Sequence, residues 1–310
     1  MLKRRQLLQL SATAAAAAGL GLSIQGRANT PALITKTIPS SGEAIPVIGM
    51  GTSRTFDVDA SDEAIAPLQD VLAAFFKAQG SVIDSSPMYG KAESRVGDIL
   101  RNMAARPPVF AATKVWTEGR EAGITQMEES ARRMAVEKFD LIAVHNLTDW
   151  QTQLDTLKRW KAEGKVRYIG ITTSHGRDHD EFLEVMRSEP LDFVQFSYNI
   201  DDRAAEEALL PTAAERGIAT MINRPFQRGS LFGITRDKAL PEVAADIDCN
   251  SWGQFFLKFI LSHPAATCVI PATSKLHHME DNMQANFGRL PDAAQREEML
   301  RAFAALQADA

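Results

Sequence analysis

The 310-residue sequence has no excess of basic side chains, little cysteine and no spaced metal ligands. Its 34 Lys and Arg residues against 39 Asp and Glu residues give a net charge of −5, which argues against nucleic-acid binding because that function needs a basic face. Its two cysteines, Cys249 and Cys268, permit one disulfide without demanding it. An apolar fraction of 45% and a charged fraction of 24% are typical of a soluble globular protein.

The first 28 residues have too few strongly hydrophobic side chains, and too polar an end, for a membrane span. Lys3-Arg4-Arg5 precedes a weakly apolar, Ala-rich segment, and Gly26-Arg27-Ala28 follows it as a small-x-Ala cleavage candidate. This pattern predicts a twin-arginine secretory signal, although an N-terminal helix on a cytosolic enzyme is the alternative. We expect a signal peptide over residues 1–28, recognition by the twin-arginine translocation machinery, one domain over residues 29–310 and a periplasmic location.

From residue 34 onward, apolar runs alternate with amphipathic helical patterns, and no linker interrupts them. A hairpin is expected first, over residues 34–38 and 45–48. The following strands are expected near residues 82–84, 109–115, 141–145, 166–171, 193–196, 218–222 and 267–270, and the helices at 62–78, 93–101, 124–137, 151–163, 182–187, 204–216, 252–261, about 280–286 and from 292. Continuous apolar runs indicate strands covered on both faces, and therefore a parallel sheet. With Val47 counted as the first of eight strands, the fold class is α/β: a (β/α)8 TIM barrel with an N-terminal β-hairpin and an extra C-terminal helix.

Polar residues stand where the strands of such a barrel end. Asp84 and Tyr89 follow the strand at residue 82, Lys114 ends the next strand, and His145 ends the one after. Barrel enzymes place their working groups at the C-terminal ends of strands. Each residue also has an ordinary interpretation: a turn-capping Asp, a core Tyr, a surface Lys whose stem is buried, and a core His. Together they indicate acid–base chemistry.

These four residues are able to polarise a carbonyl group and protonate it. A phenol has an ordinary pKa near 10, and a buried ammonium within hydrogen-bond reach lowers that pKa. We expect Asp84 to hold Lys114 charged, Lys114 to assist Tyr89, and His145 to donate to the carbonyl oxygen.

With these four residues the chain resembles the aldo-keto reductase family, and the resemblance extends from about residue 34 to residue 292. Asp84, Tyr89, Lys114 and His145 match the order and spacing of that family's Asp-Tyr-Lys-His tetrad. The segments Asp84–Gly97 and Asp140–Gly170 fit its signatures. The resemblance implies carbonyl reduction, with Tyr89 as proton donor and NADPH lying across the barrel mouth without a GxGxxG loop. Trp116 matches a residue that lines the family's substrate pocket.

The resemblance also implies residues that hold the cofactor. They are Thr52, Asp84, Thr172, Thr173, Gln195, Asn223, Arg224, Pro225, Phe226, Arg228, Gly229, Ser230, Thr273, Ser274, Lys275, His278, Asp281 and Asn282. Asn223 replaces a ring that many members stack on the nicotinamide. Ala272 and His278 replace basic residues that meet the ribose 2′-phosphate, so Lys275 is the candidate cation there. NADPH is expected, and NADH is not excluded.

The sequence leaves two functions open. One is an exported reductase of a small aldehyde or ketone. The other is an exported nucleotide-binding or sensing protein of the same fold with little turnover. The intact tetrad favours the reductase, whereas a nucleotide that does not exchange favours the sensor.

Overall fold

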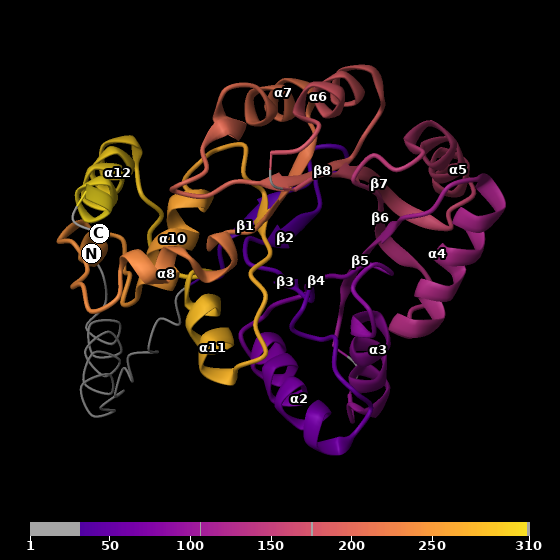
Figure 1. Ribbon diagram of the computed structural model, residues 1–310, viewed down its shortest axis with the longest axis horizontal. Coiled ribbons are helices and arrows are strands. Elements are labelled where there is room, and N and C mark those ends of the chain that lie inside the picture. Colours follow the sequence, from indigo (N-terminus) through magenta and orange to yellow (C-terminus); the bar gives the residue numbers. More distant parts are fainter. Residues whose placement is uncertain (1–31, 106, 175, 309–310) are drawn as a thin grey trace, which may run out of the picture. The chain divides into compact units, whose positions relative to one another are not determined.

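A computed structural model describes residues 32–105, 107–174 and 176–308. Eight strands form one parallel sheet in which each strand pairs with the next along the chain. Parallel bridges from Ile48 to Val269 and from Gly51 to Ala272 join its two edges, so the sheet closes on itself. Helices surround the strands (Figure 1). The predicted (β/α)8 barrel is confirmed, and the predicted signal peptide lies outside the described residues.

The hairpin and the barrel strands follow the sequence pattern closely. The hairpin pairs β1 (Thr35–Thr37) with β2 (Ala44–Pro46). The barrel strands are β3 (Met50–Gly51), β4 (Val82–Asp84), β5 (Phe110–Val115), β6 (Phe139–His145), β7 (Val166–Thr172), β8 (Phe193–Ser197), β9 (Ala219–Asn223) and β10 (Cys268–Val269). The first barrel strand was expected at Val47: the regular strand β3 begins at Met50, while the pairing with β10 already starts at Val47, whose carbonyl oxygen accepts the Val269 N–H at 2.8 Å.

The helices also match, with one break. They are α2 (Asp62–Lys77), α3 (Ala92–Asn102), α4 (Arg120–Met134), α5 (Trp150–Ala162), α6 (His179–Ser188), α7 (Leu209–Arg216), α10 (Trp252–Leu261), α11 (Leu276–Gln284) and α12 (Ala293–Ala308). The helix expected over 204–216 is a 3-10 turn, η1 (Ala204–Glu206), followed by α7. The first turn of a helix accommodates proline because its missing N–H has no intrahelical partner there, and starting α7 at Leu209 places Pro211 in that turn. The sequence patterns missed η2 (Gln227–Gly229), α8 (Leu231–Ile234) and α9 (Val243–Asp246).

The alternation of side chains along the strands explains how polar groups reach the barrel mouth. One buried cluster includes Val82, Phe110, Leu141 and Phe193, one from each of four strands. Successive side chains of a strand point to opposite faces, so a residue two or four positions further on points to the same side. Asp84, Lys114, His145 and Gln195 stand two or four positions after these four, nearer the carboxyl ends of their strands. The polar side chains therefore point inward at one end of the barrel.

The hairpin closes the opposite end. Ile38 and Ile45 belong to the same buried cluster as the interior strand residues. Lys36 Nζ donates to the carbonyl oxygens of Leu261, His263 and Ala266 at 2.8, 3.0 and 2.6 Å, which ties the hairpin to the end of α10. The hairpin therefore covers one end of the barrel, and the polar side chains gather at the other.

Two further expectations concern the cysteines and the membrane. Cys249 and Cys268 are both buried free thiols, and burial raises the pKa of each to about 12. Within the described part of the chain, no helix is both long and apolar enough to cross a membrane.

Candidate active site

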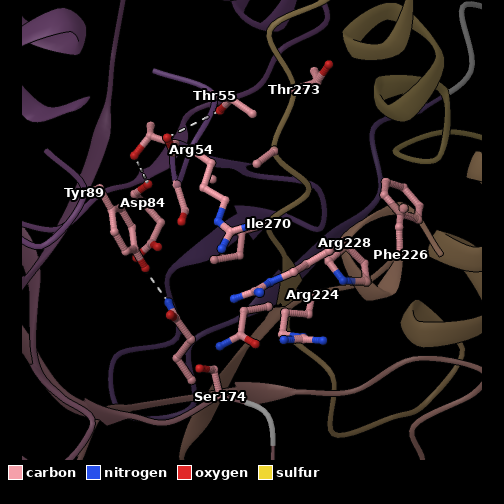
Figure 2. Close-up of a pocket in the computed structure, with 18 of the residues that line it drawn as sticks. Arg54, Thr55, Asp84, Tyr89, Ser174, Arg224, Phe226, Arg228, Ile270 and Thr273 are labelled. Atoms are coloured by element: carbon pink, nitrogen blue, oxygen red, sulfur yellow. Dashed lines mark hydrogen bonds between the residues drawn. The ribbon is translucent and has the colours of Figure 1, made fainter. Parts of the chain in front are cut away.

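A cavity of about 940 Å³ opens at the C-terminal ends of the strands. Asp84 of β4, His145 of β6, Thr172 of β7, Gln195 of β8 and Asn223 of β9 all line it. In Figure 2, Asp84 and Tyr89 lie together on one side, and the guanidinium groups of Arg54 and Arg228 extend toward the middle. The parallel topology therefore gathers residues from segments far apart in the sequence.

A buried ion pair forms the floor of this site. Lys114 Nζ donates to both carboxylate oxygens of Asp84, at 2.8 and 2.7 Å, and to the carbonyl oxygen of Ser85 at 2.7 Å. Gln195 Nε2 adds a bond to Asp84 Oδ1 at 3.1 Å. Burial alone would lower the pKa of Lys114, but the Asp84 carboxylate and the Tyr89 phenol more than offset it and raise that pKa. The ammonium therefore stays charged, as expected.

Tyr89 lies directly over this pair. Lys114 Nζ is 5.2 Å from the centre of its ring, and the ring meets His145 edge to face, with centroids 5.8 Å apart. Burial raises the pKa of Tyr89, although the charge of Lys114 pulls the pKa down. The expected lowering by Lys114 is present, but the net direction is the opposite of our prediction, because desolvation of the phenolate outweighs the attraction. The phenol is a protonated group at neutral pH.

His145 is uncharged at neutral pH. Burial lowers the pKa of its imidazole to about 3, and the positive charges of Lys114 and Arg177 act in the same direction. Its Nδ1 lies 2.9 Å from Ser86 Oγ. Trp116, the expected substrate-pocket residue, has its ring 6.4 Å from the imidazole ring and is not itself part of the cavity wall. A neutral imidazole and a protonated phenol thus stand side by side.

Most of the residues expected to hold a cofactor line this cavity. Those that do are Thr52, Asp84, Thr172, Thr173, Gln195, Asn223, Arg224, Pro225, Phe226, Arg228, Gly229, Thr273, His278, Asp281 and Asn282. Ser230, Ser274 and Lys275 are outside the lining. Asn223 is held in place by donating to the carbonyl oxygen of Thr173 at 2.9 Å and accepting from Ser197 at 2.7 Å.

The sequence reasoning missed several wall residues. They are Gly51, Ser53, Arg54, Thr55, Asp57, Met88, Gly90, Asn146, Ser174, Arg177, Phe232 and Ile270. The position of some of them could have been predicted from the sequence, because they follow the first and fifth barrel strands, and the loops after the strands form the sites of barrel enzymes. Met88, Gly90 and Asn146 lie within the two signature segments, but those segments pointed to the tetrad rather than to these neighbours.

The arginines make the cavity a fitting place for a polyanion such as a nucleotide cofactor. Nε and Nη1 of Arg224 are buried without a hydrogen-bond partner, while its Nη2 donates to Gln227 Oε1 at 2.9 Å. Burial and the nearby charges of Arg228, Arg54 and Arg177 hold the pKa of Arg224 below its ordinary value. A partly buried guanidinium with two unpaired nitrogens among other cations is stabilised by a phosphate that accepts hydrogen bonds from those nitrogens.

Comparisons with known proteins agree with this geometry. The model of the aldo/keto reductase family matches residues 47–297. "Methylglyoxal reductase YeaE" of Escherichia coli is 27% identical over 256 residues, covering 80% of this chain and 88% of that protein. The "NADH-specific methylglyoxal reductase" of the same organism is 29% identical over 190 residues, covering 51% and 56%.

A solved structure gives the same architecture. The aldo-keto reductase from Klebsiella pneumoniae, solved in complex with NADPH, superposes with a TM-score of 0.69 at 23% identity and covers 87% of this chain and 96% of its own. At that identity the likeness speaks for the fold, whereas the family model spans most of the chain and includes all four residues of the tetrad. The chain therefore belongs to the aldo/keto reductase family of oxidoreductases.

Proposed function

We propose that this oxidoreductase reduces a small aldehyde or ketone to the alcohol, with NADPH as its cofactor. One observation carries the proposal: a protonated phenol and a neutral imidazole share one cavity wall above a buried Lys114–Asp84 pair. When bound, NADPH supplies the hydride that reduces the carbonyl carbon.

The chain's own residues handle the proton and the carbonyl oxygen. Tyr89 gives its phenolic proton to that oxygen, and the Lys114 ammonium stabilises the phenolate that remains. Asp84 keeps Lys114 charged and in place through two hydrogen bonds. His145, being neutral, supplies a second hydrogen bond to the oxygen as negative charge develops on it.

The cofactor assignment rests on the cavity wall. Arg224 and Arg228 are the proposed pyrophosphate ligands, and Thr172, Thr173 and Gln195 are proposed to hold the nicotinamide carboxamide. Support comes from the unpaired nitrogens of Arg224 and from the NADPH complex of the Klebsiella structure. NADH remains an alternative, since one relative is named for it and Lys275 is outside the cavity wall.

We also propose that the protein is exported. Residues 1–28 have the composition of a twin-arginine signal, a type read by the translocation route that passes folded proteins. A reductase that works outside the cytoplasm must bind its nucleotide before it leaves, because the cavity exists only in the folded barrel. The signal and the cofactor site are therefore compatible with each other.

Replacing Tyr89 by phenylalanine tests the catalytic proposal. The variant keeps the ring and loses the proton donor, so NADPH binding should be unchanged while reduction of methylglyoxal falls by at least about 100-fold. Because burial holds the pKa of Tyr89 above its ordinary 10.0, the wild-type rate should not fall between about pH 7 and 9. The assay is the NADPH absorbance. A variant as fast as wild type rules out Tyr89 as donor, and a wild type that binds NADPH without turnover favours the sensing protein.

A further inference from the structure

Ser86 connects the two groups that face the carbonyl oxygen. It stands in the turn between β4 and Tyr89, and its carbonyl oxygen accepts the Tyr89 N–H at 3.0 Å. Its hydroxyl oxygen accepts the Met88 N–H at 3.2 Å and lies 2.9 Å from His145 Nδ1. The residue has no exposed surface. One serine thus braces the loop that carries the phenol and contacts the imidazole.

The hydrogen bonds around Ser86 decide which nitrogen of His145 carries the proton. A neutral imidazole has one N–H, and the partner at one nitrogen determines the tautomer. If Nδ1 carried the proton, it would donate to Ser86 Oγ, and the buried serine proton would find no other acceptor among the described residues. A buried hydroxyl left without an acceptor is unfavourable. If Ser86 donates to Nδ1 instead, both groups are satisfied.

The orientation of the His145 ring determines which of its nitrogens faces the cavity. The Nδ1 edge of His145 is occupied by Ser86, so the Nε2 edge is the one that the ring presents to the cavity it lines. With the proton on Nε2, the imidazole donates to a carbonyl oxygen. With the proton on Nδ1, it presents a lone pair, which repels that oxygen.

We propose that Ser86 is a positioning residue, which donates its hydroxyl proton to His145 Nδ1 and thereby keeps the His145 proton on Nε2, facing the substrate carbonyl. The inference rests on the proposed carbonyl reduction and names a residue whose side chain does not itself touch the substrate. Ionisation does not interfere, because burial, Lys114 and Arg177 keep the imidazole neutral and the neighbouring phenol of Tyr89 is uncharged.

The test measures the tautomer directly. Protein labelled with ¹⁵N in its histidines is examined by imidazole nitrogen NMR, and the His145 signals are identified by their loss in His145→Gln. Wild type should show a protonated Nε2 and an unprotonated Nδ1. Ser86→Ala should show protonation at Nδ1 as well, and its kcat for methylglyoxal should fall about 3- to 10-fold, the effect of one hydrogen bond, while NADPH affinity is unchanged.

Matched variants separate positioning from damage to the fold. Ser86→Thr keeps the hydroxyl and should restore both the tautomer and kcat; if its methyl group prevents folding, Ser86→Cys replaces it and should give an intermediate tautomer ratio. Ser85→Ala removes the neighbouring buried hydroxyl, which accepts from Thr52 rather than contacting His145, and should leave the tautomer as in wild type.

Two results overturn the inference. One is a wild-type His145 protonated on Nδ1, and the other is a Ser86→Ala variant that keeps its proton only on Nε2. The NMR measurement requires no turnover. A wild type that fails to reduce methylglyoxal therefore contradicts the proposed function, while the tautomer result still decides the role of Ser86.

Discussion

Replacing Lys114 by methionine should strongly destabilise the barrel. The ammonium is fully buried, its partner Asp84 is only 4% exposed at the side chain, and three hydrogen bonds join it to Asp84 and Ser85. Methionine fills a similar volume, but it leaves a buried carboxylate without its cation. Breaking a buried ion pair from one side costs about 3–5 kcal/mol, a large part of the roughly 5–15 kcal/mol of a typical domain.

Urea unfolding followed by circular dichroism measures this loss. The matched control is Lys165→Met, because Lys165 pairs with Glu163 at 2.7 Å on the surface, with side chains 58% and 53% exposed. An exposed pair contributes about 0–1 kcal/mol, so this variant should unfold almost as wild type does.

A double variant identifies the cause. Adding Asp84→Asn to Lys114→Met removes the uncompensated charge and keeps an oxygen for Gln195, so about 2 kcal/mol of stability should return. The reasoning is refuted if Lys114→Met is no more destabilising than Lys165→Met, or if the double variant is no more stable than Lys114→Met alone.

Two other predictions concern the cofactor and export. Arg224→Gln should weaken NADPH binding about 10- to 100-fold in a fluorescence titration, which is the range of a charged hydrogen bond. Because two nitrogens of the guanidinium are unpaired, the melting temperature of the nucleotide-free protein should not fall. Arg301→Gln on α12 is the control, and equal NADPH affinities for both variants would contradict the phosphate assignment. Arg4→Lys combined with Arg5→Lys should leave the precursor folded and nucleotide-bound in the cytoplasm, which cell fractionation and mass spectrometry would detect. If this variant is instead found outside the cytoplasm, cleaved after Ala28, the protein uses an export route other than the twin-arginine one.

Much of the barrel and its tetrad could be predicted from local patterns. Strand β5 reads as a continuous apolar run because both faces of a barrel strand are buried, and Lys114 stands out as the one charge within it. The period of two along a strand then places Asp84 and His145 on the same inner side at the same end. The order of residues was therefore enough to predict which side chains reach the active site from the strand ends.

Tertiary structure decided what depends on distance between segments. Tyr89 was expected to have a lowered pKa, but the depth of its burial, which no spacing reveals, reverses the direction. Arg54 and Arg224 come from loops 170 residues apart, and only closure of the barrel brings them to one cavity. Ser86 is one of two adjacent serines in the sequence. Only in the folded loop does the Ser86 hydroxyl point toward His145, while the Ser85 hydroxyl points toward Thr52. Periodicity is a property of the chain, whereas desolvation, charge convergence and hydrogen-bond direction arise only when distant segments meet.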